Sequence, residues 1–417
     1  MITSVTVTPV AFPDPPLLNA VGVHQPWALR AIVQAHHADG AVGLGETYGD
    51  TAHLALLERV APTLVGLDPF DLNRLDALVT AAVGDTNAPD AHGLTGQSTA
   101  GKTRARVVAA FEVACLDLQG RLVGRPVHAL LGGKVRDAVP YSAYLFYKWA
   151  AHPGAEPDGW GEALDPDGVV AQARRMVERY GFGSIKLKGG VFPPEQEIAA
   201  IRALREAFPH APLRLDPNAA WTPPTSMTVA AETAGLLQYL EDPTPGIAGM
   251  AEVAAAAPMP LATNMCVVSV EDLEPAVRAR AVGVILADHH FWGGLRGAQR
   301  LIAVCDAFDL GVSMHSNSHL GVSLAAMTHL AAATPILTYA CDTHTPWQGG
   351  VDVVAEPLPF VDGAVPVPDT PGLGVELDPD ALARLHENYL RCGVRTRDDV
   401  GYFRSIRPGE ELRWPRW

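Results

Sequence analysis

The stretch at residues 184–216, SIKLKGGVFPPEQEIAAIRALREAFPHAPLRLD, decides the fold class of this chain. A short apolar run, SIKLK, is followed by a segment whose apolar residues recur at helical spacing, and then by a second short run, LRLD. Strand, helix and strand in this order indicate two parallel strands joined by a crossover helix. We therefore expect an α/β fold in this part of the chain.

The same alternation continues on both sides of this stretch. Six further short apolar runs alternate with helical segments, namely YSAYLF, YLED, PLATN, VGVILAD, GVSMHS and ILTYACD. Together with SIKLK and LRLD they make eight runs in roughly 220 residues, which is about what one (β/α)8 barrel needs. We predict a (β/α)8-type, modified TIM barrel as a catalytic domain over residues 131–355.

The two ends of the chain have a different pattern. SVTVTPV alternates like a strand, residues 28–48 read as two strands joined at 38–40, and residues 102–123 carry one apolar stripe of a helix that stops before Gly124. These signals predict an N-terminal α+β capping domain over residues 1–130. The segment 356–417 is rich in Pro and Gly and then helical, and we expect it to pack back on the cap.

Composition excludes several classes of protein. The 417 residues carry 31 basic and 46 acidic side chains, a net charge of −15, without a basic stripe, so we expect no nucleic-acid partner. There is no apolar run of membrane-spanning length and no signal-peptide pattern, so we expect no membrane partner and a cytoplasmic location. The five cysteines are scattered without CxxC spacing, which argues against a disulfide framework or a structural zinc site.

Polar residues stand at the ends of the predicted strands. From SIKLK onward they are Lys188, Asp216, Glu241, Asn264, Asp288 and His315. The steps between them are 28, 25, 23, 24 and 27 residues, and one βα unit of a typical barrel occupies roughly 30. Successive strands therefore present a polar group at the same end, which is the end where barrel active sites are built.

Each of these residues also has a simpler interpretation. Asp216 and Glu241 come just before prolines and could shape turns, and Asn264 could cap a helix. Lys186 and Lys188 share one face of a strand that could be a solvated edge, although inside a barrel both would need partners. The regular interval of all six strand ends favours the functional interpretation.

The residue types indicate a reaction. Two carboxylates and an amide oxygen, from Asp216, Glu241 and Asn264, are the hard donors that suit Mg²⁺. Such a cation polarises a substrate carboxylate and permits removal of the α-proton. Lys188 on one side, and His315 oriented by Asp288 on the other, would offer a base to each face of one α-carbon.

Several longer motifs resemble those of a known family. GETYGD, IKLKGGV, LRLDPNAAW, DHHFWGG, HSNSH and DTHTPWQ occur in order along nearly the whole chain. This order resembles the enolase superfamily, mandelate racemase subgroup, and is most similar to glucarate dehydratase and related acid-sugar dehydratases. The resemblance implies a carbon–oxygen lyase that uses Mg²⁺ to dehydrate a glucarate-like aldarate to a keto-deoxy diacid. It also implies a homo-oligomer.

The resemblance assigns roles to the strand-end residues. Lys188 would be one base, and Lys186 would interact with the substrate carboxylate and tune Lys188. Asp216, Glu241 and Asn264 would be the metal ligands. His315, paired with Asp288, would protonate the leaving hydroxyl.

The resemblance also implies substrate contacts. These are Asn19, His24, Tyr147, Asn218, His344 and Arg397. The guanidinium of Arg397 suits a distal carboxylate, but a surface ion pair with Asp398 or Asp399 is the alternative. HSNSH has Ser318 where the family's dehydratases commonly have Asn, and the segment GDTNAPDAHGLTGQS at 84–98 is distinctive. The identity of the acid sugar is therefore left open.

Three other functions compete with this one. A zinc hydrolase would use His289, His290, His315 and His319, but the H-x₃-H spacing of HSNSH suits a helix, whereas here it ends a strand. An acid-sugar racemase or epimerase needs the same two bases without a leaving group, and is the main alternative. A non-catalytic relative that binds acidic ligands is disfavoured by the intact Lys188, His315 and metal ligands.

Overall fold

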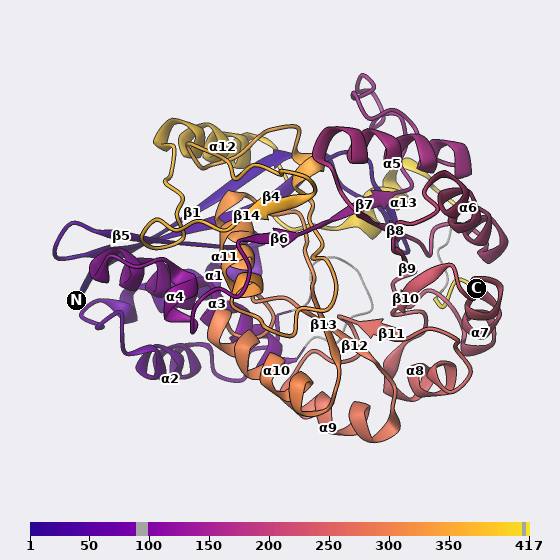
Figure 1. Ribbon diagram of the computed structural model, residues 1–417. Helices are drawn as coiled ribbons and strands as arrows, with labels where there is room; N and C mark the ends of the chain where they lie inside the picture. Colours follow the sequence, from indigo (N-terminus) through magenta and orange to yellow (C-terminus); the bar gives the residue numbers. More distant parts are fainter. Residues whose placement is uncertain (89–98, 411–413) are drawn as a thin grey trace.

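The computed structural model describes residues 1–88, 99–410 and 414–417. An antiparallel sheet with its helices forms a cap on one side, and a curled parallel sheet surrounded by helices forms the other (Figure 1). This is the predicted fold class, a modified barrel with an N-terminal α+β capping domain. Most of the segment 84–98 noted above lies outside the described residues.

The cap is built on a three-stranded sheet. Its strands β1 (Ile2–Pro13), β4 (Trp27–His37) and β5 (Val42–Tyr48) pair antiparallel in the order β1-β4-β5. The predicted hairpin is confirmed, with β4 and β5 joined through Gly40, whose φ of 83° suits only glycine at low cost. The helices are α1 (Thr51–Val60), α2 (Leu72–Val83), α3 (Ala100–Val123) and α4 (Val127–Leu130), and α3 ends before a left-handed Gly124 as predicted.

Seven parallel strands form the curled sheet, in the order β13-β12-β11-β10-β9-β8-β7. They are β7 (Ser142–Phe146), β8 (Ser184–Lys188), β9 (Leu213–Asp216), β10 (Leu237–Glu241), β11 (Leu261–Thr263), β12 (Val284–Ala287) and β13 (Gly311–Met314). The helices between and after them are α5 (Pro166–Tyr180), α6 (Pro194–Ala207), α7 (Pro223–Glu232), α8 (Gly246–Ala254), α9 (Val270–Ala279), α10 (Leu295–Ala307) and α11 (Gly321–Ala332).

The eighth predicted strand, ILTYACD, is not a regular strand. Its residues instead join the two edge strands through isolated bridges, Leu337 to Val312 of β13 and Cys341 to Tyr141 before β7. Between these bridges the carbonyl of Ala340 accepts side-chain hydrogen bonds from Arg214 (2.8 Å) and Ser313 (2.9 Å). The ring is therefore completed by isolated bridges and side-chain hydrogen bonds, and not by a continuous ladder.

The register of the sheet places the charged residues in layers. Lys186 lies opposite Arg214, and Lys188 lies opposite Asp216, across the β8–β9 pair. Lys186 and Lys188 therefore share the inner face, as the alternation of SIKLK predicts, and both are buried.

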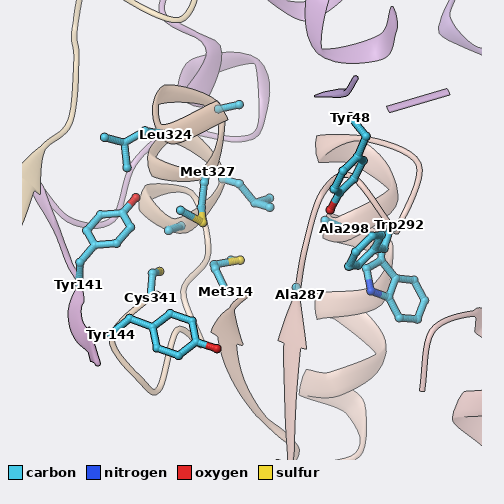
Figure 2. Packing of buried hydrophobic residues seen from close by; sticks show 14 of the residues in the cluster. Tyr48, Tyr141, Tyr144, Ala287, Trp292, Ala298, Met314, Leu324, Met327 and Cys341 are labelled. Carbon is cyan, nitrogen blue, oxygen red and sulfur yellow. The ribbon is translucent and has the colours of Figure 1, made fainter. Parts of the chain in front are cut away.

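Helix α11 lies between the barrel and the cap. Its few polar residues, Ser323, Thr328 and His329, do not form a stripe, and every residue from Gly321 to Ala332 is buried. Figure 2 shows Met327 of this helix next to Met314, which follows the arrow of its strand, and Leu324 on the side of Tyr141. A helix without a polar stripe is typical of one covered on all sides.

A second contact fastens the cap to the barrel. The carboxylate of Glu112 on α3 accepts hydrogen bonds from the backbone N–H groups of Leu295 (2.9 Å) and Arg296 (3.0 Å). These are the first residues of α10, so a side chain of the cap caps a barrel helix. Gly294 has a φ of 92°, and a Cβ there would lie 2.2 Å from the Glu112 carboxylate.

The C-terminal segment returns to the cap. Helix α12 (Pro379–Arg391) packs against β1, where His386 Nδ1 lies 2.7 Å from the carbonyl oxygen of Pro9. Helix α13 (Asp399–Ile406) packs beside the short strand β3 (Gly22–Val23), which pairs with β2 (Leu18–Asn19). A two-stranded ribbon of β6 (Ala138–Pro140) and β14 (Ala364–Pro366) links this segment to the start of the barrel. In the part of the chain that the structure describes, no helix is long and apolar enough to cross a membrane.

Candidate active site

The ends of the barrel strands and the cap enclose one small cavity of about 60 Å³. Its lining residues come from the cap, the barrel and the C-terminal segment: Asn19, His24, Lys102, Tyr144, Phe146, Lys188, Asn218, Asn264, Met265, Phe291, His315, Ser316, Asn317, His344 and Arg397. A larger surface cavity of about 630 Å³, near α5, contains none of the predicted site residues. The small cavity is therefore the candidate active site.

Lys186 is fully buried among carboxylates at this end of the barrel. Its Nζ lies 2.7 and 2.6 Å from the two carboxylate oxygens of Glu241 and 2.7 Å from Asp342 Oδ2. Burial alone would lower the pKa of Lys186, but the carboxylates of Asp342 and Glu241 raise it well above its usual value. Lys186 is thus held as a permanent positive charge.

Lys188 sits one layer closer to the cavity. It donates to Asp216 Oδ2 at 2.7 Å and also contacts the side-chain oxygen of Asn218. Burial would raise the pKa of Asp216, but Lys188 and Lys186 lower it below its usual range. The other oxygen of Asp216 accepts the backbone N–H of Asn218 at 3.0 Å, so the aspartate both shapes the turn before Pro217 and faces the lysines.

Glu241 and Asn264 lie next to each other. Asn264 Nδ2 is 3.3 Å from Glu241 Oε1. The neighbouring Asp242 holds Asn264 in place, because its Oδ2 accepts the Asn264 backbone N–H at 2.8 Å. Asn264 is not a helix cap, since α9 is capped by Ser269.

The donor set of Asp216, Glu241 and Asn264 fits a hard divalent cation. Burial raises the pKa of Glu241 well above its usual value, and the charge of Asp216 raises it further. Two buried carboxylates that disfavour each other's charge, with the amide group of Asn264 beside Glu241, are a donor set suited to Mg²⁺. The residues present therefore fit the metal that the sequence implies.

On the other side of the cavity, His315 and Asp288 form a pair. His315 Nδ1 lies 3.0 Å from Asp288 Oδ2, which leaves Nε2 as the ring nitrogen for proton exchange. Burial would raise the pKa of Asp288, but the two histidines beside it outweigh that effect and hold the pKa well below its usual value. The second histidine is His290, whose Nδ1 lies 2.8 Å from Asp288 Oδ1.

The histidines of this region do not form a convincing zinc site. Among the described residues, Asp288, His289 and His290 are the one group of at least three His, Cys, Asp or Glu whose ligand atoms lie within 4.8 Å of each other. However, Asp288 is already bonded to two imidazoles, and Arg30 Nη2 lies 2.9 Å from His290 Nε2. A guanidinium at a ligand nitrogen repels a cation, which disfavours the zinc hydrolase alternative.

Arg397 forms a buried ion pair with Asp399. Its Nε and Nη2 donate to the two oxygens of Asp399 at 3.0 and 2.9 Å, and Arg397 is only 9% exposed. The sequence analysis offered a surface ion pair of Arg397 with Asp398 or Asp399 as the alternative. The ion pair with Asp399 exists, but it is buried and not at the surface. Asn19 also donates to Asp399, at 2.9 Å, and both Asn19 and Arg397 line the cavity.

Three more predicted contacts line the cavity. His24 is held by Asp14 at 3.1 Å, and His344 Nδ1 lies 3.0 Å from the hydroxyl of Ser316. Burial and neighbouring cationic groups lower the pKa of His344 well below its usual value, so this imidazole is neutral. Asn218, which contacts Lys188, has a left-handed φ of 54° that aims its side chain back at the strand ends.

Comparison with known proteins shows the family to which this chain belongs. The family described as "Mandelate racemase / muconate lactonizing enzyme, N-terminal domain" matches residues 2–132, and "Enolase C-terminal domain-like" matches residues 168–381. A probable glucarate dehydratase from Streptomyces coelicolor is 56% identical over 430 aligned residues, covering 100% of this chain and 99% of the relative. The chain belongs to the enolase superfamily, in its mandelate racemase subgroup.

Solved enolase-superfamily structures share the whole fold. A protein from Thermobispora bispora, solved with magnesium and formate, has a TM-score of 0.99 and 65% identity and covers 100% of both chains. One from Pseudomonas fluorescens, solved with magnesium, potassium and tartrate, has a TM-score of 0.96 and 52% identity, covering 100% of this chain and 99% of the other. The protein is thus an enzyme of the enolase superfamily.

One predicted contact lies away from the cavity. Tyr147 follows β7, packs edge-on against Phe192 at 4.8 Å, and is not among the lining residues. Tyr144 takes the position instead, because it points inward from β7 and its hydroxyl donates to Asp216 Oδ2 at 3.2 Å. The registers Tyr144–Lys186 and Phe146–Lys188 explain the difference, since the inward face of β7 carries even-numbered residues.

Asp342 is a site residue that the sequence analysis did not single out. It is fully buried and contacts Lys186 at 2.7 Å. A signal was present, because Asp342 closes the run ILTYACD and stands 27 residues after His315, within the range of the other strand-end steps. Extending the regular spacing of the strand-end residues by one more βα unit would therefore have pointed to Asp342.

Proposed function

We propose that this enolase-superfamily enzyme is a Mg²⁺-dependent dehydratase of an acid sugar, a glucarate-like aldarate. The observation that carries the proposal is that Lys188 and His315 line the same small cavity, together with the oxygen donor Asn264. Behind them, Asp216 contacts Lys188 and Asp288 contacts His315. Two bases near one enclosed substrate suit a reaction that begins with removal of a proton next to a carboxylate. The 56% identity to a probable glucarate dehydratase supports this substrate class.

Asp216, Glu241 and Asn264 would hold the cation. When bound, Mg²⁺ supplies positive charge that polarises the substrate carboxylate and stabilises the enolate. Lys186 adds a second fixed positive charge, because Glu241 and Asp342 keep it protonated. Lys188, in contact with Asp216 and Asn218, is positioned to take or return the α-proton.

His315 completes the dehydration. A base removes the α-proton, and the electron pair of the C–H bond forms a double bond between the α-carbon and the carboxylate carbon, which moves negative charge onto the carboxylate oxygens. These electrons then form the C=C bond between the α- and β-carbons, while the bond from the β-carbon to its hydroxyl breaks. His315 Nε2 gives the departing hydroxyl a proton, so that it leaves as water, and Asp288 stabilises the imidazolium before transfer. The remaining enol tautomerises to the keto-deoxy acid.

The far end of the cavity suits a second anionic group. Arg397 and Asn19 come from the C-terminal segment and the cap, and both are oriented by Asp399. Burial alone would lower the pKa of Arg397, but the carboxylate of Asp399 raises it, so the guanidinium is charged. A charged guanidinium in this position supports recognition of the distal carboxylate of a diacid.

A screen of stereoisomeric sugar diacids and monoacids with a carbonyl-detecting assay tests the proposal. We expect an α-keto acid from one or more diacids in the presence of Mg²⁺. If no keto product forms while solvent deuterium enters a substrate, the enzyme is instead an epimerase or racemase. If neither reaction occurs but acid sugars bind, the enzyme is a non-catalytic relative.

A further inference from the structure

The aspartate of the catalytic pair has a second histidine partner. Asp288 Oδ2 is bonded to His315, while Oδ1 accepts the backbone N–H of His290 at 2.9 Å and lies 2.8 Å from its ring Nδ1. Each carboxylate oxygen is therefore committed to one histidine. The orientation of Asp288, and with it that of His315, depends on His290.

The proton of His290 can be located from its other neighbour. Arg30 Nη2 lies 2.9 Å from His290 Nε2. A guanidinium only donates hydrogen bonds, so Nε2 must accept and the ring proton must be on Nδ1, facing Asp288. A second proton on Nε2 would set two donors against each other across this 2.9 Å contact.

Arg30 is itself held from both parts of the molecule. Its Nε donates to Glu46 Oε1 at 2.7 Å, and both residues belong to the cap sheet, on β4 and β5. Glu46 in turn accepts the backbone N–H groups of Leu320 and Ser323, both at 2.8 Å, at the start of α11. All these groups are buried, so the connection is rigid and little screened by solvent.

We propose that His290 is a positioning residue, held by Arg30 of the cap in its neutral form with the proton on Nδ1, so that Asp288 stabilises positive charge on His315 alone. The proposal extends the function proposed above, in which His315 must carry a proton to the leaving hydroxyl. Arg30 and His290 are 260 residues apart in sequence, and they connect the cap sheet to the reacting histidine.

The groups that surround the two imidazoles limit the alternatives. Three elements outside its own loop face His290, through Arg30 of β4, Tyr48 of β5 and Ser323 of α11. Asp288 and His289 face it from its own loop. Further titratable groups nearby are Glu46, His53 and His319. His315 is faced by Asp288 and by the ring of Phe291 at 5.9 Å, with His344 across the cavity. Burial lowers the pKa of His289 well below its usual value and that of His319 to about 4, so both are neutral near pH 7.

Nitrogen NMR of the histidine-labelled wild-type enzyme tests the tautomer without any substrate. We expect the His290 resonances to show a protonated Nδ1 and an unprotonated Nε2 at neutral pH. A protonated Nε2 would overturn the proposal. Because this measurement needs no turnover, it remains decisive even if the enzyme dehydrates no acid sugar, and failure of the substrate screen alone would overturn only the proposed function.

A pair of His290 variants then tests the positioning role. His290→Asn keeps an N–H donor near the Nδ1 position, whereas His290→Gln places its amide near the Nε2 position. We expect His290→Asn to retain activity within about threefold and His290→Gln to lose at least about tenfold in kcat with little change in KM. Equal activity of the two variants, or a loss confined to KM, would contradict the proposal.

Removing Arg30 tests the charge argument through the pH profile. In Arg30→Met, His290 becomes free to take a second proton and to share the charge of Asp288. The alkaline limb of the kcat profile should then move to lower pH by about half a unit or more, because a positive His315 is less stabilised. Glu112→Gln, which disturbs a cap–barrel contact away from Asp288, is the matched control and should leave the limb in place. An unmoved limb in Arg30→Met would refute the charge argument.

Discussion

The two sides of the active site are built in different ways. The lysine side is built mainly from side chains of the neighbouring strands β8, β9 and β10, and Asp342 adds one carboxylate from the segment after β13. The histidine side reaches from His315 through Asp288 and His290 to Arg30 in the cap. The lysine side is therefore determined by strand register, whereas the histidine side depends on how two separate parts of the chain meet.

Removal of the divalent cation should disrupt the lysine side most strongly. Chelation should abolish turnover, since the carboxylates of Asp216 and Glu241 then have no metal charge to share, and Mg²⁺ should restore it. Differential scanning calorimetry should also show stabilisation by Mg²⁺, about 2.7 kcal/mol at a hundredfold excess over Kd. Asn264→Ala should weaken this stabilisation. Recovery with Zn²⁺ alone, and not with Mg²⁺, would contradict the metal assignment.

The next largest loss of activity is expected when the base on either side is removed. Lys188→Ala and His315→Gln should each lower kcat by about 10³-fold, because each deletes a proton-transfer group. Stopped-flow or coupled keto-acid assays would measure the loss. Lys134→Ala, at a lysine paired with the exposed Asp369 away from the cavity, is the control and should retain activity. Full activity in both base variants would refute the two-base mechanism.

A substitution at Asp342 tests the buried layer of the lysine side, around Lys186, separately from Lys188. Asp342→Asn removes one carboxylate from the buried Lys186 and should reduce kcat/KM by about tenfold or more. It should also lower the free energy of unfolding by about 1–3 kcal/mol, measured by urea titration. Asp369→Asn removes an exposed carboxylate from Lys134 and should change neither quantity noticeably. An unchanged Asp342→Asn enzyme would show that Lys186 does not need this partner.

The smallest expected effect on turnover comes from His319 on the histidine side, where the change is in the pH dependence of stability. Burial lowers the pKa of His319 to about 4 from its ordinary 6.5, so the folded state binds fewer protons than the unfolded chain between these values. The stability associated with neutral His319 is present above about pH 6.5 and is lost as pH falls to about 4, an effect of about 3 kcal/mol. His319→Asn should flatten stability over this range, whereas the exposed His210→Asn should not. Equal slopes would refute this role.

The contrast also explains what could be predicted from sequence. The sequence predicts that Asp216, Glu241, Asn264, Asp288 and His315 lie together, because parallel strands bring their carboxyl ends to one edge at a regular interval. The resemblance implies Tyr147 as a substrate contact, whereas the register of β7 with β8 turns Tyr144 inward, and one sequence does not reveal that register. The eighth strand was predicted as regular because its side-chain hydrogen bonds from Arg214 and Ser313 come from distant strands.

No sequence pattern relates Arg30 to His290. The two residues lie on different parts of the chain and meet only after the cap has docked on the barrel. The same is true of Asp399, which orients both Asn19 and Arg397 from the C-terminal helix α13. Contacts of this kind depend on tertiary packing and not on local spacing, so they were visible only in the structure.

The Glu112 contact has a consequence for protein engineering. Since this cap side chain provides the hydrogen bonds that close the first turn of α10, exchanging the whole cap with that of another family member would leave a barrel helix uncapped unless the donor has a carboxylate at the same place. Gly294 would have to be transplanted with it. Chimeras that graft single loops onto the native cap should therefore express and fold better than whole-domain exchanges.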